Sequence, residues 1–379
     1  MNIPKLRFKE FNDEYKTYKF NDICIFFSGG TPTSSNKEYY NGSIPFIRSG
    51  EIYSDKTELH INQDAINNSS AKLVKKGDLL LALYGATSGN VSISKINGAI
   101  NQAILCLRPN NNFSVIYIKY LLENAKDNIL KTYLQGGQGN LSAEIIKKLN
   151  YLFPQKKEQE KIGNMLVLLD KKIELQSKKI EDLKLFKLYT KNQIFKNFDE
   201  IFKLKDILVK WNKKNKNNFV KYVESISNKY GFISQSDQFE DRNVASKDLN
   251  NYYIIEKGVF GYNPSRLNVG SLALKTNDKV SVVSPLYECF TTSQNNQYLL
   301  EWFDSKYFRK ETISKFEGGV RNTLNFSNLC EIEIGLPTIE KQNKYSKVFK
   351  IFNNKIEFEV KKLYKLQELK KGLMQSMFV

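Results

Sequence analysis

Histidine and cysteine, the side chains that most often bind metals or act as nucleophiles, are scarce and scattered in this chain. His60 is the only histidine among 379 residues, so no histidine cluster can bind a metal or perform acid–base catalysis. The four cysteines form no CxxC pair, which argues against a zinc site and against disulfides and favours a reducing compartment. They are Cys24, Cys106, Cys289 and Cys330. The sequence therefore predicts no metal site.

The motifs that bind nucleotides or transfer methyl groups are also missing. No GxxxxGK[ST] loop for ATP occurs, and "GATSGN" (residues 85–90) has glycines without the lysine, which indicates a turn. No glycine fingerprint leads from an apolar strand into a helix, as an S-adenosylmethionine pocket would need. Amino-methyltransferases carry Asp/Asn-Pro-Pro-aromatic, whereas "NPSR" at residues 263–266 lacks the second proline and the aromatic residue. We predict that the chain is not an enzyme and binds no cofactor itself.

The charge balance indicates a polyanionic partner. Lysine and arginine number 58 against 40 acidic residues, which gives a net charge of +18 and a pI near 9.4. Nucleic acid is the simplest such partner, although a Lys-, Asn- and Ile-rich composition can also make a protein basic. No apolar run approaches the ~18 residues of a membrane span, and the N-terminus has no apolar signal core. We therefore expect no membrane partner and a cytoplasmic location.

DNA recognition uses cations, amides, hydroxyls and backbone N–H groups in turns between strands. Such residues gather in six turn-like segments of this chain, and for each residue the alternative is an ordinary turn residue with internal hydrogen bonds. In the first half, the candidates are Thr31, Thr33, Arg48, Ser49, Tyr84, Thr87, Ser88, Asn90, Gln138 and Asn140. In the second half, they are Asn263, Arg266, Asn268, Arg321 and Asn322.

These candidate residues lie within an internal repeat. "LQGGQGNLSAEIIKKLNYLFP" (134–154) and "FEGGVRNTLNFSNLCEIEIGLP" (316–337) share a Gly-Gly turn, an Asn, a short apolar stretch and a closing Pro. Pro154 and Pro337 are 183 residues apart, and the register holds without a gap to Phe195 and Phe378. Proline is favoured in the first turn of a helix, where its missing N–H needs no partner. The repeat therefore predicts a long helix after each proline.

Apolar residues recur every 3.5 positions along both predicted helices. This spacing predicts a coiled-coil seam, which polar residues interrupt at matched positions, Gln176 with Glu359 and Lys187 with Lys370. The alternative is a pair of amphipathic helices on separate domains, but about 40 helical residues extend ~60 Å, which exceeds a small domain. The predicted seam comprises Ile162, Leu166, Leu169, Ile173, Ile180, Leu183, Tyr345, Phe349, Phe352, Ile356, Leu363 and Leu366.

A segment rich in short strands precedes each helix. Both segments open with a similar predicted strand start, "KFNDI" at 19–23 and "KLKDI" at 203–207. "KKGDLLLALYGATSGNVSI" and "EKGVFGYNPSRLNVGSLAL" resemble each other further along, and "YIKYLLENAKDNIL" reads as a helix. The predicted order is domain, helix, domain, helix. A two-fold relation between the halves requires the helices to run antiparallel.

This arrangement resembles the specificity subunit of a type I restriction–modification system along the full length of the chain. The resemblance rests on the two long helices after "LFP" and "GLP", on "FSGGTPTSSNKEYYNGSIPFIRSGEI", and on the twin "GG-x-x-N" phrases. It implies an α+β fold with two α/β target-recognition domains, separated by the family's two long conserved helices in an antiparallel coiled coil, and an internal pseudo-two-fold repeat. The implied boundaries are 1–153 and 199–336 for the domains, and 154–198 and 337–379 for the spacer helices.

The resemblance also implies function and partners. Each domain would read one half of a split, asymmetric site in double-stranded DNA, while the helices would set the gap and bind two modification subunits. Those subunits would bring S-adenosylmethionine, and a restriction subunit would add ATP and Mg. The second domain lacks the "GGTP" opening of the first. The alternatives are a self-contained DNA-modifying enzyme, and a coiled-coil scaffold that binds nucleic acid.

Overall fold

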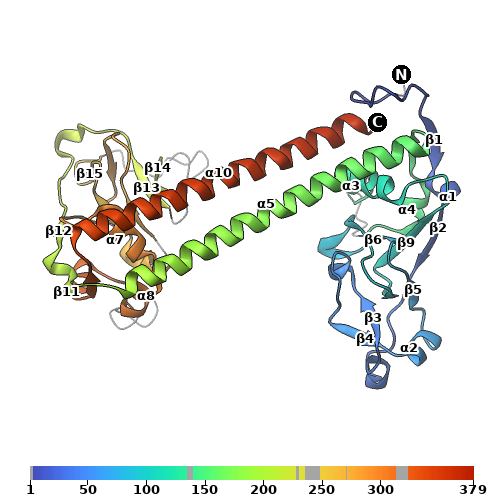
Figure 1. The fold of residues 1–379 in the computed structure, drawn as a ribbon, viewed down its shortest axis with the longest axis horizontal. Helices are drawn as coiled ribbons and strands as arrows, with labels where there is room; N and C mark the ends of the chain where they lie inside the picture. The colour runs from blue at the N-terminus through green and yellow to red at the C-terminus, as the bar shows by residue number, and fades with distance from the viewer. Residues whose placement is uncertain (1–2, 135–139, 228–229, 235–247, 270, 313–322) are drawn as a thin grey trace. The chain divides into compact units, whose positions relative to one another are not determined.

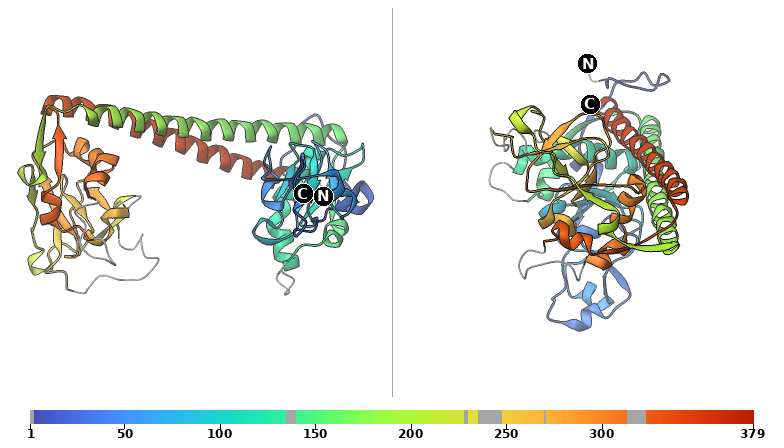
Figure 2. Two further views of the ribbon diagram at one scale, coloured as in Figure 1. Left: turned by 90° about the horizontal axis from the view of Figure 1, so that it is seen from below. Right: turned by 90° about the vertical axis from the view of Figure 1, so that its left-hand side faces the viewer.

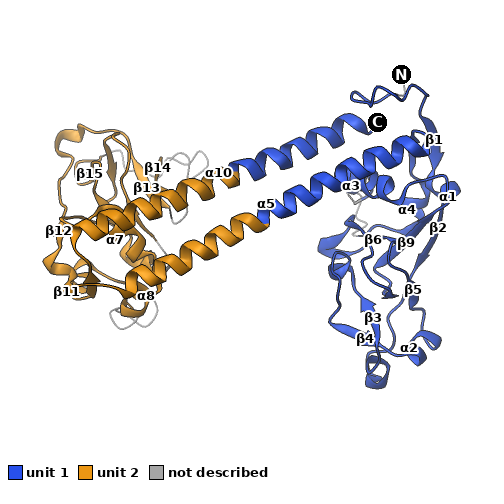
Figure 3. Ribbon diagram, in the orientation of Figure 1, with its two compact units in different colours: residues 1–177, 361–379 blue, residues 178–360 orange. Residues whose placement is uncertain are grey.

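In a computed structural model, the chain contains two long helices, two sets of short strands and several shorter helices (Figure 1). The structure forms two compact units, which Figure 3 colours separately: residues 1–177 with 361–379, and residues 178–360. The described residues are 3–134, 140–227, 230–234, 248–269, 271–312 and 323–379.

Each long helix contributes a segment to both units. Helix α5 (Lys156–Lys196) has 41 residues and α10 (Ile339–Met377) has 39, so each is ~60 Å long at 1.5 Å per residue. Both begin two residues after the repeated prolines, Pro154 and Pro337. The unit boundary falls after Ser177 in α5 and after Val360 in α10, which are also 183 residues apart. The predicted helices are therefore confirmed, with the same internal register.

The two helices lie side by side in each unit and pack along the predicted seam (Figures 1 and 2). In the first unit, the early part of α5 shares an apolar cluster with the end of α10, and in the second unit the late part of α5 packs against the start of α10. The helices are therefore antiparallel. Ile162, Leu166, Leu169, Ile180, Phe349 and Leu366 are buried, and Ile173, Leu183, Tyr345, Phe352, Ile356 and Leu363 are partly buried.

The first unit contains two four-stranded sheets. One has the antiparallel order β2 (Cys24–Ser28), β9 (Ile104–Pro109), β6 (Leu79–Ala82), β7 (Val91–Ile93). The other has the order β4 (Leu59–Ile61), β3 (Ile44–Ile47), β8 (Gly98–Ile100), β5 (Lys72–Val74), in which β3 and β8 are parallel. Helix α3 (Val115–Leu134) follows β9, and its apolar side joins the first sheet and the long helices in one core cluster.

The second unit repeats this plan. Its four-stranded sheet has the order β12 (Leu208–Lys210), β19 (Glu288–Thr292), β16 (Phe260–Tyr262), β17 (Leu272–Leu274). Two further pairs are β15 (Tyr253–Ile255) with β18 (Ser281–Val283), and β13 (Glu224–Ser227) with β14 (Gly231–Ser234). Helices α7 (Asn296–Phe303), α8 (Lys306–Thr312) and α9 (Phe326–Cys330) follow, and the core combines the sheet, α7 and the long helices.

Equivalent connections occur at matched positions of the two units. Strand β1 (Lys16–Lys19) pairs with β10 (Asn150–Phe153), as β11 (Glu200–Lys203) pairs with β20 (Glu333–Leu336). Helix α4 (Ala143–Lys148) precedes β10, as α9 precedes β20. Gly77 and Gly258 turn the chain before β6 and β16 with φ of 99° and 93°, a conformation that L-residues other than glycine rarely adopt. The internal repeat predicted from the sequence is confirmed.

One local prediction was wrong. The segments "KFNDI" and "KLKDI" do not start strands: β1 and β11 end at their lysines, and a short helical turn follows, α1 (Phe20–Ile23) or η4 (Leu204–Asp206). The reason is burial of the next side chain. Phe20 and Leu204 are fully buried, and their N–H groups donate to the carbonyls of Leu149 and Ile332 instead of continuing the strand.

The described part of the chain contains no helix that is long and apolar enough to cross a membrane. Nor do its described histidine, cysteine and acidic side chains form a group of three that could hold a metal ion.

Candidate nucleic-acid interface

Thr31 and Thr33 follow strand β2 on an exposed segment. Thr31 Oγ1 donates to Gln102 Oε1 at 2.5 Å, and the carbonyl of Thr33 accepts from the N–H of Asn36. The glycines before them serve internal packing. A Cβ on Gly29 would lie 1.7 Å from the Ile100 carbonyl oxygen, and one on Gly30 would lie 2.1 Å from Ser70 Oγ, so neither position leaves room for a side chain. The two glycines therefore let the backbone before the exposed threonines pack closely against Ile100 and Ser70.

Arg48 and Ser49 lie directly after strand β3, at the start of the turn η2 (Ser49–Glu51). The Arg48 guanidinium is about half-exposed and paired with two carboxylates. Its Nε donates to Glu51 Oε2 at 3.1 Å, and a terminal nitrogen donates to Glu58 Oε2 at 2.5 Å. Both hydrogen bonds raise the pKa of Arg48, and the hydrogen bond with Glu51 has the larger effect. Sequence reasoning missed both carboxylates, although Glu51 is only three residues away.

The turn between β6 and β7, η3 (Gly85–Thr87), presents Tyr84 and Thr87. Tyr84 is exposed, and Thr87 Oγ1 donates to the Tyr84 carbonyl at 3.3 Å. Ser88 is buried, with its hydroxyl donating to the Leu83 carbonyl at 3.0 Å, and Asn90 Oδ1 accepts from Lys126 Nζ at 2.6 Å. Ser88 and Asn90 therefore hold the shape of the turn. Lys126 lies on α3, and no local sequence signal connects it with Asn90.

Asn140 is exposed and lies next to the same turn. The N–H of its neighbour Leu141 donates to the Leu83 carbonyl at 3.0 Å, which brings two of the predicted segments, 84–90 and 140, together at one edge of the first unit. Gln138 lies outside the described residues.

The second unit has an equivalent turn between β16 and β17, η6 (Pro264–Val269). Asn263 Oδ1 accepts from the N–H of Ser265 at 3.0 Å, so this side chain caps the turn. Arg266 is exposed, and its guanidinium has no ion pair among the described residues. The N–H of Leu324 donates to the Pro264 carbonyl at 3.1 Å, which repeats the contact of Leu141. Arg321, Asn322 and the side chain of Asn268 lie outside the described residues.

Tyr53 is a further candidate that the sequence did not single out. Its ring is half-exposed in the segment after Arg48. Burial of the phenol and the nearby charge of Glu123 raise the pKa of Tyr53, whereas the backbone of Val91 lowers it. Val91 is the first residue of β7. The hydrogen bond of Tyr53 with the Val91 backbone therefore joins the segment after Arg48 to the strand that follows the η3 turn. An exposed tyrosine and arginine can stack on bases or hydrogen-bond to phosphates and base edges.

Exposed hydroxyls, amides and guanidinium groups thus gather on turns at matched places in both units, with different residue types in each. Such groups can recognise the base edges and phosphates of nucleic acid. No nucleophile with an adjacent base occurs among the described residues of these turns.

Comparisons with known proteins agree with this picture. Residues 12–185 match the family described as the type I restriction modification DNA specificity domain. The MjaIX specificity subunit of a type I restriction enzyme from Methanocaldococcus jannaschii is 30% identical over 196 residues, 49% of this chain and 44% of that protein, so this alignment spans less than half of the relative. The MjaVIII specificity subunit from the same organism is 22% identical, over 96% of this chain and 91% of that protein.

Solved structures show the same fold over the whole chain. The S subunit of a type I restriction–modification system from M. genitalium has a TM-score of 0.61 at 16% identity, covering 100% of this chain and 99% of that one. A chain from a study of complex assembly and conformational transition in a type I system has a TM-score of 0.60 at 10% identity, covering 96% of this chain and 97% of that one.

Proposed function

Because this chain belongs to the specificity subunits of type I restriction–modification systems, we propose that it reads a bipartite, asymmetric site in double-stranded DNA. In this proposal each domain recognises one half-site, and the chain itself catalyses nothing. The observation that carries the proposal is the repeat: the same turn occurs in both units with different residues, Tyr84 and Thr87 in one and Asn263 and Arg266 in the other. Tyr84 and Arg266 are exposed, and Thr87 and Asn263 are partly exposed. One scaffold presented twice with different side chains suits two different half-sites.

The proposed domains are residues 1–153 and 199–336, with 154–198 and 337–379 as spacer helices. The proposed DNA contacts are Thr31, Thr33, Arg48, Ser49, Tyr84, Thr87, Gln138 and Asn140 in the first domain, and Asn263, Arg266, Asn268, Arg321 and Asn322 in the second. We assign Ser88 and Asn90 to the support of the turn, because their side chains are already engaged inside the protein.

The partners in this proposal are two modification subunits, joined by restriction subunits in the full complex. Repeated apolar side chains on the long helices support two equivalent docking surfaces. Leu168 and Leu175 on α5 are 68% and 59% exposed, and their repeat equivalents Ile351 and Phe358 on α10 are 68% and 61% exposed. Apolar side chains left in water at heptad spacing, twice at the same register, suit two copies of one partner.

S-adenosylmethionine, ATP and Mg would enter with the modification and restriction subunits. A cytoplasmic location accompanies the proposal, because the DNA and these partner enzymes are found there. No membrane takes part.

Binding assays with and without a modification subunit test the proposal. We expect specific duplex binding by the complex and no methylation by the purified chain alone. If six to ten phosphates are neutralised, affinity falls ~10³–10⁵-fold between 50 and 200 mM salt. Methylome sequencing of the host is expected to reveal a split, non-palindromic site, and a perfect palindrome would contradict two different half-sites. Methylation by the chain alone would favour a self-contained enzyme, and binding without any sequence preference would favour a scaffold.

The docking surfaces have their own test. Leu175→Glu combined with Phe358→Glu is expected to abolish binding of the modification subunit in pull-down assays. Leu185→Glu provides the control, because Leu185 is 64% exposed but its repeat equivalent is Glu368. Equal loss of binding in the control and the double variant would exclude the repeated surface.

A further inference from the structure

Lys187 on α5 and Lys370 on α10 are equivalent in the repeat, 183 residues apart. Both interrupt the apolar seam of the long helices. A lone polar position in such a seam ordinarily sets the register between two helices. In this protein each lysine makes a further contact, to the helix that follows the sheet of its domain.

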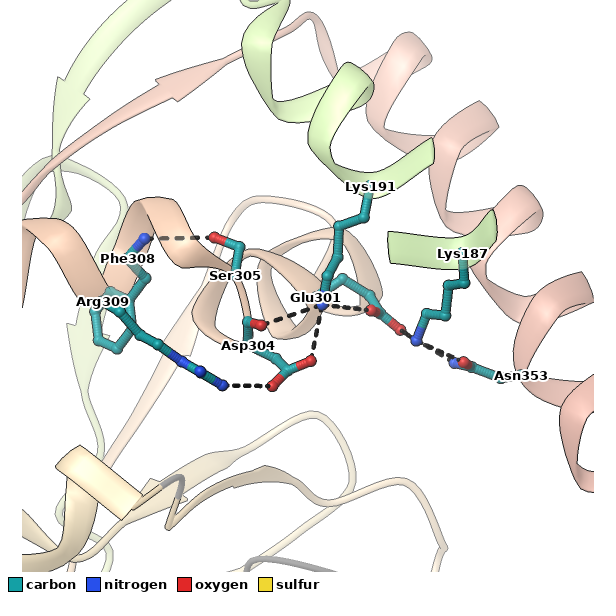
Figure 4. A network of polar contacts seen from close by, with 8 residues as sticks. All are labelled: Lys187, Lys191, Glu301, Asp304, Ser305, Phe308, Arg309 and Asn353. Atoms are coloured by element: carbon teal, nitrogen blue, oxygen red, sulfur yellow. Dashed lines mark hydrogen bonds and ion pairs between the residues drawn. The ribbon is translucent and has the colours of Figure 1, made fainter. Parts of the chain in front are cut away.

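In the second unit, the Lys187 junction consists of Lys187, Glu301 and Asn353 (Figure 4). Lys187 Nζ lies 2.9 Å from Glu301 Oε1 on α7 and 2.8 Å from Asn353 Oδ1 on α10. Asn353 Nδ2 closes the triangle by donating to Glu301 Oε1 at 3.1 Å. The Glu301 side chain is only 6% exposed. The junction therefore ties the domain helix α7 to both long helices.

In the first unit, the Lys370 junction consists of Lys370, Glu123 and Asp170. Lys370 Nζ lies 2.7 Å from Glu123 Oε1 on α3 and 2.8 Å from Asp170 Oδ1 on α5. Asp170 and Asn353 are also 183 residues apart. The same three kinds of element meet at both junctions: α5, α10 and the helix after the domain's sheet.

Each unit reinforces its junction differently. In the second unit, Lys191 Nζ contacts Glu301 at 3.5 Å and Asp304 Oδ2 at 2.7 Å, with its side chain 5% exposed. Its repeat equivalent in the first unit is the apolar Met374, which joins the core cluster. There Asp170 takes the extra contacts instead, from Tyr120 OH at 2.6 Å and Lys119 Nζ at 3.4 Å. The lysine, Lys187 or Lys370, is thus the residue that both junctions have in common, whereas the residues around it differ.

In the first unit, the junction connects to a candidate DNA-contacting turn. Glu123 and Lys126 are three residues apart on α3, a spacing that places them on one side of the helix. Glu123 receives Lys370, and Lys126 Nζ donates to Asn90 Oδ1 of the η3 turn at 2.6 Å. Helix α3 therefore contacts both Lys370 of α10 and the turn that carries Tyr84 and Thr87.

We propose that Lys187 and Lys370 are positioning residues that set the angle at which each domain is held on its helices, and thereby the spacing between half-sites that the protein accepts. The inference rests on the proposed reading of a split site. At the Lys187 junction, Glu301 has little solvent access, and such a group opposes displacement because separation would leave its charge buried. At the Lys370 junction, Glu123 and Asp170 are 34% and 36% exposed, so the contact there acts through its geometry more than through burial of charge. A small rotation at the junction would move the DNA-contacting turns by a larger distance.

The test uses the full-length chain in complex with its modification subunits. Lys187→Met and Lys370→Met place an apolar side chain of similar length at the seam and remove the contact to the domain. Lys187→Arg and Lys370→Arg keep the charge. The exposed residues Lys184 and Lys365 on the same helices provide matched Lys→Met controls. Each variant is measured against duplexes whose spacer is one or two base pairs shorter or longer than the preferred one, and base preference within the half-sites is measured in parallel.

We expect the wild-type complex to favour one spacing sharply. In Lys187→Met and Lys370→Met, the preference over spacers one base pair longer or shorter is expected to fall about tenfold, the size of one lost charge-assisted contact. Base preference within each half-site is expected to remain, and the arginine variants and the controls should keep the wild-type spacing profile.

An equal loss of affinity at every spacing would overturn the positioning role and leave the junctions as ordinary stabilising contacts. If a methionine variant is unfolded at the assay temperature, Glu123→Gln or Glu301→Gln weakens the same junction while keeping its shape, and the same comparison decides. Failure of the wild-type complex to bind any split site would instead contradict the proposed function and not the junctions.

Discussion

Gln159 in the first unit and Gln342 in the second unit each make the same pair of hydrogen bonds. Gln159 Nε2 donates to the Pro154 carbonyl at 2.8 Å, and its Oε1 accepts from the N–H of Ser114 at 2.9 Å. Gln342 Nε2 donates to the Pro337 carbonyl at 2.9 Å, and its Oε1 accepts from the N–H of Asn295 at 3.1 Å. Both side chains are buried. Each glutamine joins the start of a long helix to the start of the domain helix, α3 or α7.

Removal of this double contact is expected to destabilise the unit that contains it. Gln159→Leu would leave a buried N–H and a buried carbonyl without partners, at a cost of about 1–3 kcal/mol for each. We expect a lower urea midpoint, and faster hydrogen exchange in the first turn of α3 than in α7. Gln193→Leu, an exposed position on the same helix, is the control and should change little. Equal exchange rates in wild type and Gln159→Leu would contradict the assignment.

Asp170 is expected to make stability depend on pH in the acid range. Burial alone would raise its pKa, but hydrogen bonds from Lys370 and Tyr120 outweigh that effect and hold the pKa below the usual value. A carboxyl with a lowered folded-state pKa stabilises the fold above its unfolded pKa of about 3.9, and this contribution is lost as pH falls through the folded pKa.

Asp170→Asn reproduces the residue at the equivalent position of the second unit, Asn353. The difference in unfolding free energy between wild type and Asp170→Asn is expected to be present at pH 7 and to shrink as the pH falls below about 4. Urea titrations at several pH values measure it. A difference that stays constant down to pH 2 would show that the charge of Asp170 is not the source.

The two carboxylates beside Arg48 are expected to affect DNA binding in opposite directions. Glu51 Oε2 accepts from both the N–H and the Nε of Arg48 and so orients the side chain. Glu58 is 79% exposed and occupies a terminal nitrogen of the guanidinium. Glu58→Gln is therefore expected to strengthen binding, because DNA no longer competes with a carboxylate, and Glu51→Gln to weaken it.

Arg48→Ala completes this series. If Arg48 reads a base, its loss is expected to cost about 1–3 kcal/mol and to relax one position of the first half-site. Binding constants on a panel of single-base site variants measure both effects. A uniform loss across the panel would mark a phosphate contact, and unchanged affinity would remove Arg48 from the interface.

Insertion of one heptad after Ser177 and another after Val360 tests the helices as a ruler. Both positions lie at the boundary between the units and are equivalent in the repeat. Seven residues add ~10 Å of helix, about three base-pair steps at ~3.4 Å each. DNA rotates by roughly 100° over that length at ~10.5 base pairs per turn, whereas the coil drifts only ~20° per heptad.

Twist is therefore expected to outweigh length in this variant. We expect loss of tight binding at the original site, with weak recovery when the spacer grows by about three base pairs. Selection from a library of random spacer lengths measures this preference. Full affinity at the original spacing would exclude the helices as the ruler, and thermal unfolding of the variant provides the control for folding.

The sequence by itself determined the helices, their seam and the repeat. Helix and coiled-coil patterns depend on residues three and four positions apart, so the spacing of Ile162, Leu166 and Leu169 already specifies which side of α5 is buried. The repeated prolines located both helix starts to within two residues. The helix α3 also followed from a run of adjacent residues. The ends of strands β1 and β11 at Lys19 and Lys203 could not be predicted in this way, because burial of Phe20 and Leu204 turns the chain there.

Only the tertiary structure decided which polar residues are free to contact a ligand. Ser88 and Thr87 are neighbours of similar chemistry, yet the hydroxyl of Ser88 is buried against Leu83, while Thr87 lies on the outside of the turn. Lys370 meets Glu123 across 247 positions of sequence, and Lys126 meets Asn90 across 36. Such pairs depend on where the packed core brings distant segments of backbone together, and no local pattern of residue types carries that information.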